Sequence, residues 1–322
     1  MKNLLLSFCL MYSLHLPAQQ KNINILFTSD ITNFWIAYDS LYSTKDTLLQ
    51  LNYVKELYLK KATLGLLVFY QSNHLTAQEI RNKIIEYPKF WESIKPYTLQ
   101  TKIFSKTIGT ICNQFRKLYP SFLQPSFYFV IGALKKGGKA QNDIVAIGTE
   151  LAASNNKVNY SELPNAFKER MQLNKNCSFL IAHECVHIQQ NKIPDSTKIL
   201  LSFSLMEGSA DFIAGIITRQ TVPAPYISYG KLHEKIIWDN FKKDMYSPNL
   251  DKWLWNSRDT SILAPDLGYF VGYAICKSYY ENSKNKKKAI QEIIDINYSK
   301  LQQVIQFLIK SKYEENLNKN RL

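Results

Sequence analysis

The stretch NCSFLIAHECVHIQQ, residues 176–190, contains an H-E-x-x-H pattern formed by His183, Glu184 and His187. In an α-helix of 3.6 residues per turn these three side chains lie on one face. The apolar residues 179–182 lead into the pattern and indicate a largely buried helix. Two imidazoles one turn apart can bind one metal ion, and the carboxylate between them can reach a water held there. The alternative is two surface histidines on an amphipathic helix.

A second apolar segment follows, TKILLSFSLMEGSADFIAGIITR at residues 197–219, and predicts a buried helix. It carries Glu207 and Asp211 one turn apart, although burying an unpaired carboxylate is costly. Glu207, twenty residues after His187, is expected to be the third ligand of a His2Glu metal site with a fourth position open for water. Asp211 is expected to accept the spare ring N–H of His183. The alternative for both carboxylates is salt bridging to lysines on other helices.

This spacing, H-E-x-x-H followed after twenty residues by E-x-x-x-D, resembles the gluzincin branch of zinc peptidases, to which thermolysin belongs. Met206 departs from that branch, which usually has Asn there. The segment EGSADF (207–212) is similar to a bacterial group of zinc-dependent proteases, the DUF2268 type. Three more stretches resemble this group and the related gliding-motility lipoproteins: FYFVIGALKKGG (127–138), IVAIGTELAA (144–153) and DLGYFVGYAICKSYY (266–280). The resemblance covers residues 120–300 and implies a zincin-like fold that binds one Zn²⁺ per chain.

The periodicity of the chain predicts an α+β fold that is mainly helical. Two β-rich runs, SFYFVIG (126–132) and DIVAIG (143–148), flank the Gly-rich segment LKKGGKAQN, and we expect them to form a β-hairpin packed on the H-E-x-x-H helix. In zincins a peptide can add to the edge of such a sheet by backbone hydrogen bonds. The resemblance therefore implies a substrate-binding strand composed of Ile144, Val145, Ala146, Ile147 and Gly148. Glu150 is expected to be a further carboxylate of the cleft or a surface residue.

The chain is expected to contain a signal peptide (1–18), a helical N-terminal layer (19–120), a zincin-like core (121–310) and a polar tail (311–322). Within the helical layer, Asp46 is expected to cap one helix. Thr76 and Glu79 have the spacing of a capping box that begins another.

The first residues, MKNLLLSFCLMYSLHLPAQQ, combine one Lys, an apolar run and a Pro-Ala-Gln break. This pattern is typical of a secretory signal peptide cleaved near Ala18, so we expect an exported protein, either periplasmic or extracellular. Cys9 is a poor lipidation site because Phe8 precedes it where a small residue is required, and lipid anchoring is not expected. No later stretch has eighteen uninterrupted apolar residues, so no other membrane span is expected.

Four cysteines remain after the signal segment, each in an apolar stretch: Cys112, Cys177, Cys185 and Cys276. Disulfides are possible in an exported protein, but no framework spacing is present, and we expect buried free thiols. The net charge of +14 favours acidic peptides and anionic components of the cell envelope as partners. The lysines are scattered and no nucleic-acid-binding motif is present, which argues against nucleic-acid binding.

Two tyrosines complete the set of candidate site residues. Tyr269 and Tyr273 lie one turn apart in a predicted helix that Asp266 can cap. A phenol beside a metal can stabilise the oxyanion formed during hydrolysis, as tyrosine does in several gluzincins. The alternative for both is core packing. His233 is another candidate donor, with a surface position as its alternative.

Together, the motif and the resemblance predict a secreted zinc metallopeptidase that acts on peptides or proteins, with Glu184 as the general base. A non-catalytic zinc-binding protein of the envelope or the motility apparatus is the first alternative. An intact Glu184 argues against it, because a structural site requires only ligands. A hydrolase of another amide is the second alternative.

Overall fold

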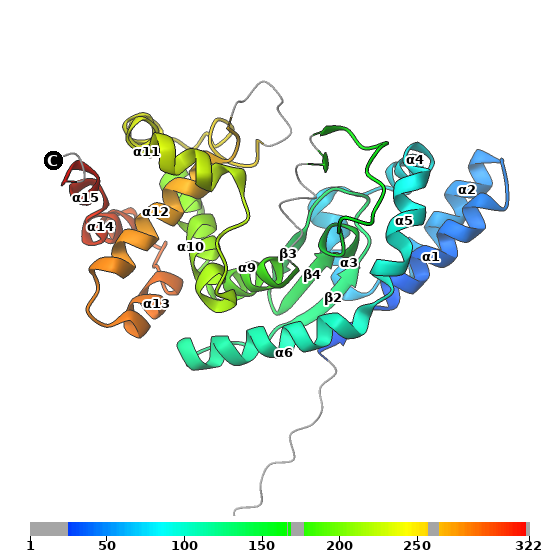
Figure 1. The fold of residues 1–322 in the computed structure, drawn as a ribbon, viewed down its shortest axis with the longest axis horizontal. Helices are drawn as coiled ribbons and strands as arrows, with labels where there is room; N and C mark the ends of the chain where they lie inside the picture. Colours follow the sequence, from blue (N-terminus) through cyan, green and yellow to red (C-terminus); the bar gives the residue numbers. More distant parts are fainter. Residues whose placement is uncertain (1–24, 166, 169–176, 257–263, 320–322) are drawn as a thin grey trace, which may run out of the picture.

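The structure, a computed structural model, describes residues 25–165, 167–168, 177–256 and 264–319. The predicted signal peptide lies outside these residues. A short strand and a layer of helices come first (Figure 1): β1 Leu26–Phe27, α1 Ser29–Tyr42, α2 Thr47–Tyr53, the π-helical turn η1 Val54–Tyr58, the 3-10 turn η2 Leu59–Lys61, α3 Leu64–Asn73, α4 Ala77–Glu86, α5 Pro88–Thr98 and α6 Thr101–Leu118. Two predicted helix starts are confirmed. Asp46 caps α2, and Thr76 and Glu79 form the capping box of α4.

The hydrophobic core is one continuous cluster that includes side chains from both halves of the chain. Phe69 and Trp91 of the helical layer are fully buried in it. Helix α3 approaches the sheet so closely that a Cβ added at Gly65 would lie 2.0 Å from the Tyr128 Cβ. The N-terminal helices therefore back the sheet and share its core.

The sheet has four strands in the order β1-β2-β4-β3, with β2 at Ser126–Val130, β3 at Gly138–Gln141 and β4 at Ile144–Gly148. Strands β1 and β2 are parallel, as are β2 and β4. The expected hairpin between the runs 126–132 and 143–148 is therefore wrong. The hairpin partner of β4 is β3, which forms within the segment expected to be a turn. Asn142 adopts the left-handed conformation (φ 54°) in the two-residue turn, which asparagine tolerates well.

This strand order also corrects the expected edge of the sheet. Both sides of β4, from Ile144 through Val145, Ala146 and Ile147 to Gly148, are hydrogen-bonded to neighbouring strands. A buried strand with two partners has no free backbone groups to offer to a peptide. The edge next to the H-E-x-x-H helix is β3, which packs against that helix.

The connection from β2 to β3 is held by two buried side chains. The Tyr58 hydroxyl donates to the Ile131 carbonyl at 2.6 Å. The Glu150 carboxylate accepts hydrogen bonds from the backbone N–H groups of Gly132 and Leu134, both at 2.9 Å. Leu134 has a left-handed backbone (φ 64°), which is unfavourable for leucine unless its surroundings enforce it. Glu150 is thus neither a cleft carboxylate nor a surface residue, and its fully buried side chain fixes the loop that leads into β3.

The remaining elements are helical (Figure 1): α7 Thr149–Ala152, α9 Cys177–Gln189, the 3-10 turn η3 Asp195–Thr197, α10 Leu200–Thr218, α11 Pro225–Asp244, α12 Leu267–Asn282, α13 Lys286–Ile294, α14 Leu301–Ser311 and α15 Tyr313–Lys319. Within the expected polar tail (311–322), residues 313–319 form the helix α15. Tyr313 anchors this helix because its ring is buried and its hydroxyl donates to Glu234 at 3.0 Å.

Helix α10 is the central helix of the C-terminal half and packs between α9 and α12. Its contact with α12 is close because both helices carry glycine there. A Cβ added at Gly272 would lie 1.7 Å from the Ser204 carbonyl oxygen, and one at Gly208 would lie 2.1 Å from the Tyr273 nitrogen. By length and composition α10 resembles a membrane span, but 78% of its apolar window is buried inside the protein. It is a core helix.

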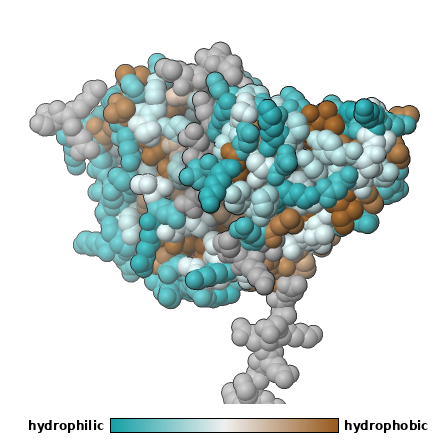
Figure 2. Space-filling view, turned by 45° about the vertical axis from the view of Figure 1, so that its right-hand side comes forward, coloured by the Kyte–Doolittle hydropathy of each residue, from teal (hydrophilic) through white to brown (hydrophobic). Residues whose placement is uncertain are grey.

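Hydrophilic side chains cover most of the face in Figure 2, where apolar groups form separate patches. The four cysteines that the structure describes are free, as expected, and Cys177 alone among them is only partly buried. The prediction of a mainly helical α+β fold, with a small sheet packed on the H-E-x-x-H helix, is confirmed.

Candidate metal centre

Three predicted ligands converge where α9 meets α10. The Nε2 atoms of His183 and His187 lie 3.0 Å apart. One carboxylate oxygen of Glu207, Oε2, lies 3.6 Å from the first of these nitrogens and 3.3 Å from the second. The three side chains are 11–17% exposed, so the group is buried but open on one side. These residues can together hold a metal ion.

The outer nitrogen of each imidazole faces a hydrogen-bond acceptor. His183 Nδ1 lies 2.9 Å from Asp211 Oδ1, as the sequence predicted, and His187 Nδ1 lies 2.7 Å from Gln190 Oε1. A carboxylate and an amide oxygen can only accept, so each Nδ1 carries a proton. Each neutral imidazole then directs an unprotonated Nε2 toward the other ligands, which is the tautomer that metal binding requires.

Asp211 has a further partner that the sequence did not suggest. Its second oxygen, Oδ2, accepts a hydrogen bond of 2.6 Å from the Tyr226 hydroxyl on α11. Asp211 is 2% exposed, and its two bonds satisfy a carboxylate that would otherwise be costly to bury. No spacing rule links Tyr226 to the motif, because its approach depends on how α11 packs. Gln190, in contrast, lies three residues after His187, a spacing that places two side chains on one helix face.

The pKa values of the two histidines and of Glu207 are shifted by the attraction between imidazole and carboxylate groups. Burial acts to lower the pKa of His183, but hydrogen bonds with Asp211 and Glu207 outweigh it and raise this pKa well above its usual value. The pKa of His187 is raised because the charge of Glu207 outweighs burial in the same way. Burial acts to raise the pKa of Glu207, yet the two histidines hold it below its ordinary range. In the absence of a metal, protons therefore bind to this group of ligands.

Glu184 lies on the same helix and is 7% exposed. Its carboxylate has no hydrogen-bond partner among the residues that the structure describes. Strand β3 passes directly beside it, since a Cβ added at Gly138 would lie 2.5 Å from Glu184 Oε1. The absence of a side chain at this glycine leaves the carboxylate the space it occupies.

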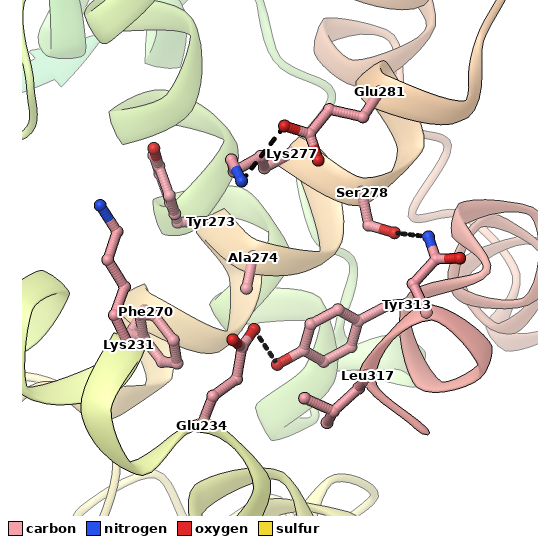
Figure 3. Close-up of a pocket in the computed structure, with 11 residues that line it drawn as sticks. Lys231, Glu234, Phe270, Tyr273, Ala274, Lys277, Ser278, Glu281, Tyr313 and Leu317 are labelled. Carbon is pink, nitrogen blue, oxygen red and sulfur yellow. Dashed lines mark hydrogen bonds and ion pairs between the residues drawn. The ribbon is translucent and has the colours of Figure 1, made fainter. Parts of the chain in front are cut away.

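The two candidate tyrosines have different surroundings. The Tyr269 ring packs 5.4 Å from the ring of Tyr226. Burial, followed by the negative charge of Glu207, raises the pKa of Tyr269, so its phenol stays protonated and can donate. Tyr273 instead lines a separate pocket between α11, α12 and α15, where Figure 3 shows it near Lys231. The oxyanion role expected for Tyr273 has no support from this position.

His233 also lies away from the ligands. Its side chain is exposed on α11, at a residue whose backbone departs from helical geometry (φ −121°, ψ 18°). Its ring centroid lies 4.3 Å from that of Tyr229, and the two ring planes are tilted by 40°. This is the surface position that was the alternative for His233.

Comparison of the chain with models of protein families, with characterised proteins and with solved structures finds no match. Two imidazole nitrogens and one carboxylate oxygen bind a borderline metal ion such as zinc, and a three-residue set leaves a position open for water. A buried carboxylate without a partner beside that set can take up and release a proton.

Proposed function

We propose that this protein is a zinc-dependent peptidase of zincin-like fold. The observation that carries the proposal is the arrangement of α9 and α10. Two histidines with both Nδ1 atoms engaged direct Nε2 toward Glu207, while Glu184 has no hydrogen-bond partner in the described part of the chain. A purely structural site requires the three ligands but has no use for a buried carboxylate held free beside them.

His183, His187 and Glu207 would hold one zinc ion through two imidazoles and a carboxylate. Zinc bound there supplies Lewis-acid chemistry, which lowers the pKa of a nearby water and polarises a carbonyl. Glu184 accepts the proton of the attacking water and later delivers it to the leaving amine. The protonated Tyr269 hydroxyl donates to the developing oxyanion.

The substrate we propose is an extended peptide lying along β3. Within the described sheet, Gly138–Gln141 hydrogen-bonds only to β4 on one side, so its other side can pair with a peptide backbone. This strand passes Glu184 at Gly138, which would bring a bound peptide to the general base. We therefore propose β3 as the strand that pairs with the substrate peptide, in place of residues 144–148. Cleavage that rises steeply with peptide length would support this mode and would disfavour a hydrolase of small amides.

We further propose that the protein is exported, because its first eighteen residues have the pattern of a signal peptide. A net charge of +14 favours acidic peptides and anionic envelope components, with an attraction that salt weakens. Periplasmic fractionation of the expressed full chain, with N-terminal sequencing of the product, tests this proposal. A product retained in the cytoplasm with Met1 intact would contradict it.

The deciding experiment compares the wild-type protein with Glu184→Gln on a diverse peptide library read by mass spectrometry, alongside metal analysis of both proteins. We expect one zinc per chain in each protein. Only the wild type should cleave, a chelator should abolish cleavage, and the variant should lose about 1,000-fold or more. Zinc bound by both proteins without cleavage by either would favour a non-catalytic envelope or motility protein. Equal cleavage by both would rule out Glu184 as the base.

A further inference from the structure

Gln190 has no role in the pattern of ligands and general base, yet its side chain contacts one of the ligands. Its Oε1 lies 2.7 Å from His187 Nδ1. Its Nε2 donates at 2.8 Å to the Met206 carbonyl and at 2.8 Å to Ser209 Oγ. We propose that Gln190 is a positioning residue that holds His187 in its metal-binding tautomer and links the two ligand-bearing helices. This inference rests on the zinc site of the proposed function.

The partners of the amide determine which way it faces. The Met206 carbonyl can only accept, so the NH2 group of Gln190 must be directed toward α10. The amide oxygen is then directed toward His187, where it can only accept. His187 Nδ1 therefore carries the proton and Nε2 keeps its lone pair. The tautomer of this ligand is set by a backbone carbonyl on the neighbouring helix, through one amide.

The same amide connects the two helices at the metal. Met206, whose carbonyl it binds, directly precedes Glu207. Ser209 is fully buried, and its hydroxyl also donates to the Met206 carbonyl at 3.1 Å. These bonds tie the α9 ligand His187 to the turn of α10 that presents Glu207. His187 Nε2 and Glu207 Oε2 lie 3.3 Å apart. This distance therefore depends on the hydrogen bonds that Gln190 makes with the Met206 carbonyl and with Ser209.

The two histidines are consequently held by different chemistry. His183 is oriented by the carboxylate of Asp211 from the opposite helix, whereas His187 is oriented by a neutral amide of its own helix. Without the Gln190 oxygen, the proton of His187 can move to Nε2 and occupy the face that the metal needs. Loss of an orienting partner of this kind lowers metal affinity about 10- to 100-fold.

Gln190→Met tests the proposal because methionine has similar length and no hydrogen-bonding amide. The adjacent Gln189 supplies a matched control. It also makes three hydrogen bonds: it accepts from Leu123 N at 2.8 Å and donates to the carbonyls of Leu123 at 2.9 Å and Cys185 at 3.3 Å. Gln189→Met therefore removes as many bonds from the same helix end without contact with a ligand.

The measurements are zinc affinity by competition with a chromophoric chelator and the ¹⁵N shifts of His187 in the metal-free full chain at alkaline pH, where the imidazole is neutral. We expect Gln190→Met to bind zinc about 10- to 100-fold more weakly than wild type, and Gln189→Met to bind within about threefold. The ¹⁵N spectrum of wild type and Gln189→Met should show the proton of His187 on Nδ1, and the spectrum of Gln190→Met should show a second population.

Equal zinc affinities and unchanged ¹⁵N spectra in the two variants would overturn the proposal, as would an equal loss of affinity in both. Failure to bind zinc in the wild type would refute both the inference and the proposed function. Selective weakening in Gln190→Met, with no peptide cleaved by the wild type, would leave Gln190 as a positioning residue and refute only the peptidase activity.

Discussion

Replacing Gly138 with alanine tests the closest contact between the sheet and the general base. The new Cβ would lie 2.5 Å from Glu184 Oε1, 2.7 Å from its Cγ and 2.8 Å from its Cδ. Carbon contacts are comfortable only at about 3.5 Å or more, so the carboxylate has to move by about 1 Å. The backbone of Gly138 is not left-handed and accepts alanine without strain. The displaced group is a flexible side chain, so the fold should tolerate the change.

A displacement of about 1 Å from productive geometry costs about 100-fold in rate, which corresponds to about 2.7 kcal/mol of transition-state stabilisation. We therefore expect Gly138→Ala to lower kcat about 100-fold while zinc affinity and thermal stability stay close to wild type. The three nearest contacts of the new methyl group are all with Glu184.

The assay is steady-state cleavage of the best peptide from the library, with zinc content and melting temperature measured on the same samples. Gly109→Ala is the control, because it lies on an exposed face of α6 and a Cβ there has no atom within 4 Å. This control should keep full activity and gain a few tenths of a kcal/mol in stability. Unchanged kcat in Gly138→Ala would refute the reasoning, since Glu184 would then tolerate displacement.

Three further predictions address the proposed oxyanion donor Tyr269, the proton that His183 binds in the metal-free protein, and the loop between β2 and β3 that Glu150 holds. Tyr269→Phe should lower kcat about 10- to 100-fold with little change in KM, whereas Tyr273→Phe should leave kinetics unchanged; equal effects of both would contradict their different surroundings. In the metal-free protein the charged form of His183 stabilises the fold below its ordinary pKa of 6.5, and this stabilisation is lost as the pH rises through its raised pKa. Zinc has to displace that proton, so the rise in melting temperature on adding zinc should grow between about pH 5 and pH 8; a rise that does not depend on pH would show that the histidines bind no proton there. Glu150→Ala should destabilise the protein by about 3 kcal/mol in urea unfolding, because two buried N–H groups lose their acceptor, and a loss below about 1 kcal/mol would show that the loop satisfies them in another way.

The ligand set was predictable because helix geometry is local. A spacing of four residues places His183 and His187 on one face whatever surrounds the helix, and the same rule relates Glu207 to Asp211. The burial of α10 was predictable because its sequence is almost entirely apolar. The two carboxylates within that sequence then indicated that they have binding partners. Gln190 was within reach of the same reasoning, since it lies one turn after a ligand.

The sequence by itself therefore determined the helices, their polar faces and the residues able to bind a metal, because each depends on neighbours within a turn of the chain. The tertiary structure alone decided which strand forms the edge of the sheet, since β2 and β4 pair in parallel and leave that position to β3. It also decided that Tyr269 packs against Tyr226, the hydrogen-bond partner of Asp211, that Tyr273 lines a separate pocket, and that Glu150 supports a loop. These outcomes depend on contacts between segments far apart in the chain, and no local periodicity encodes which distant partner packs against a given side chain.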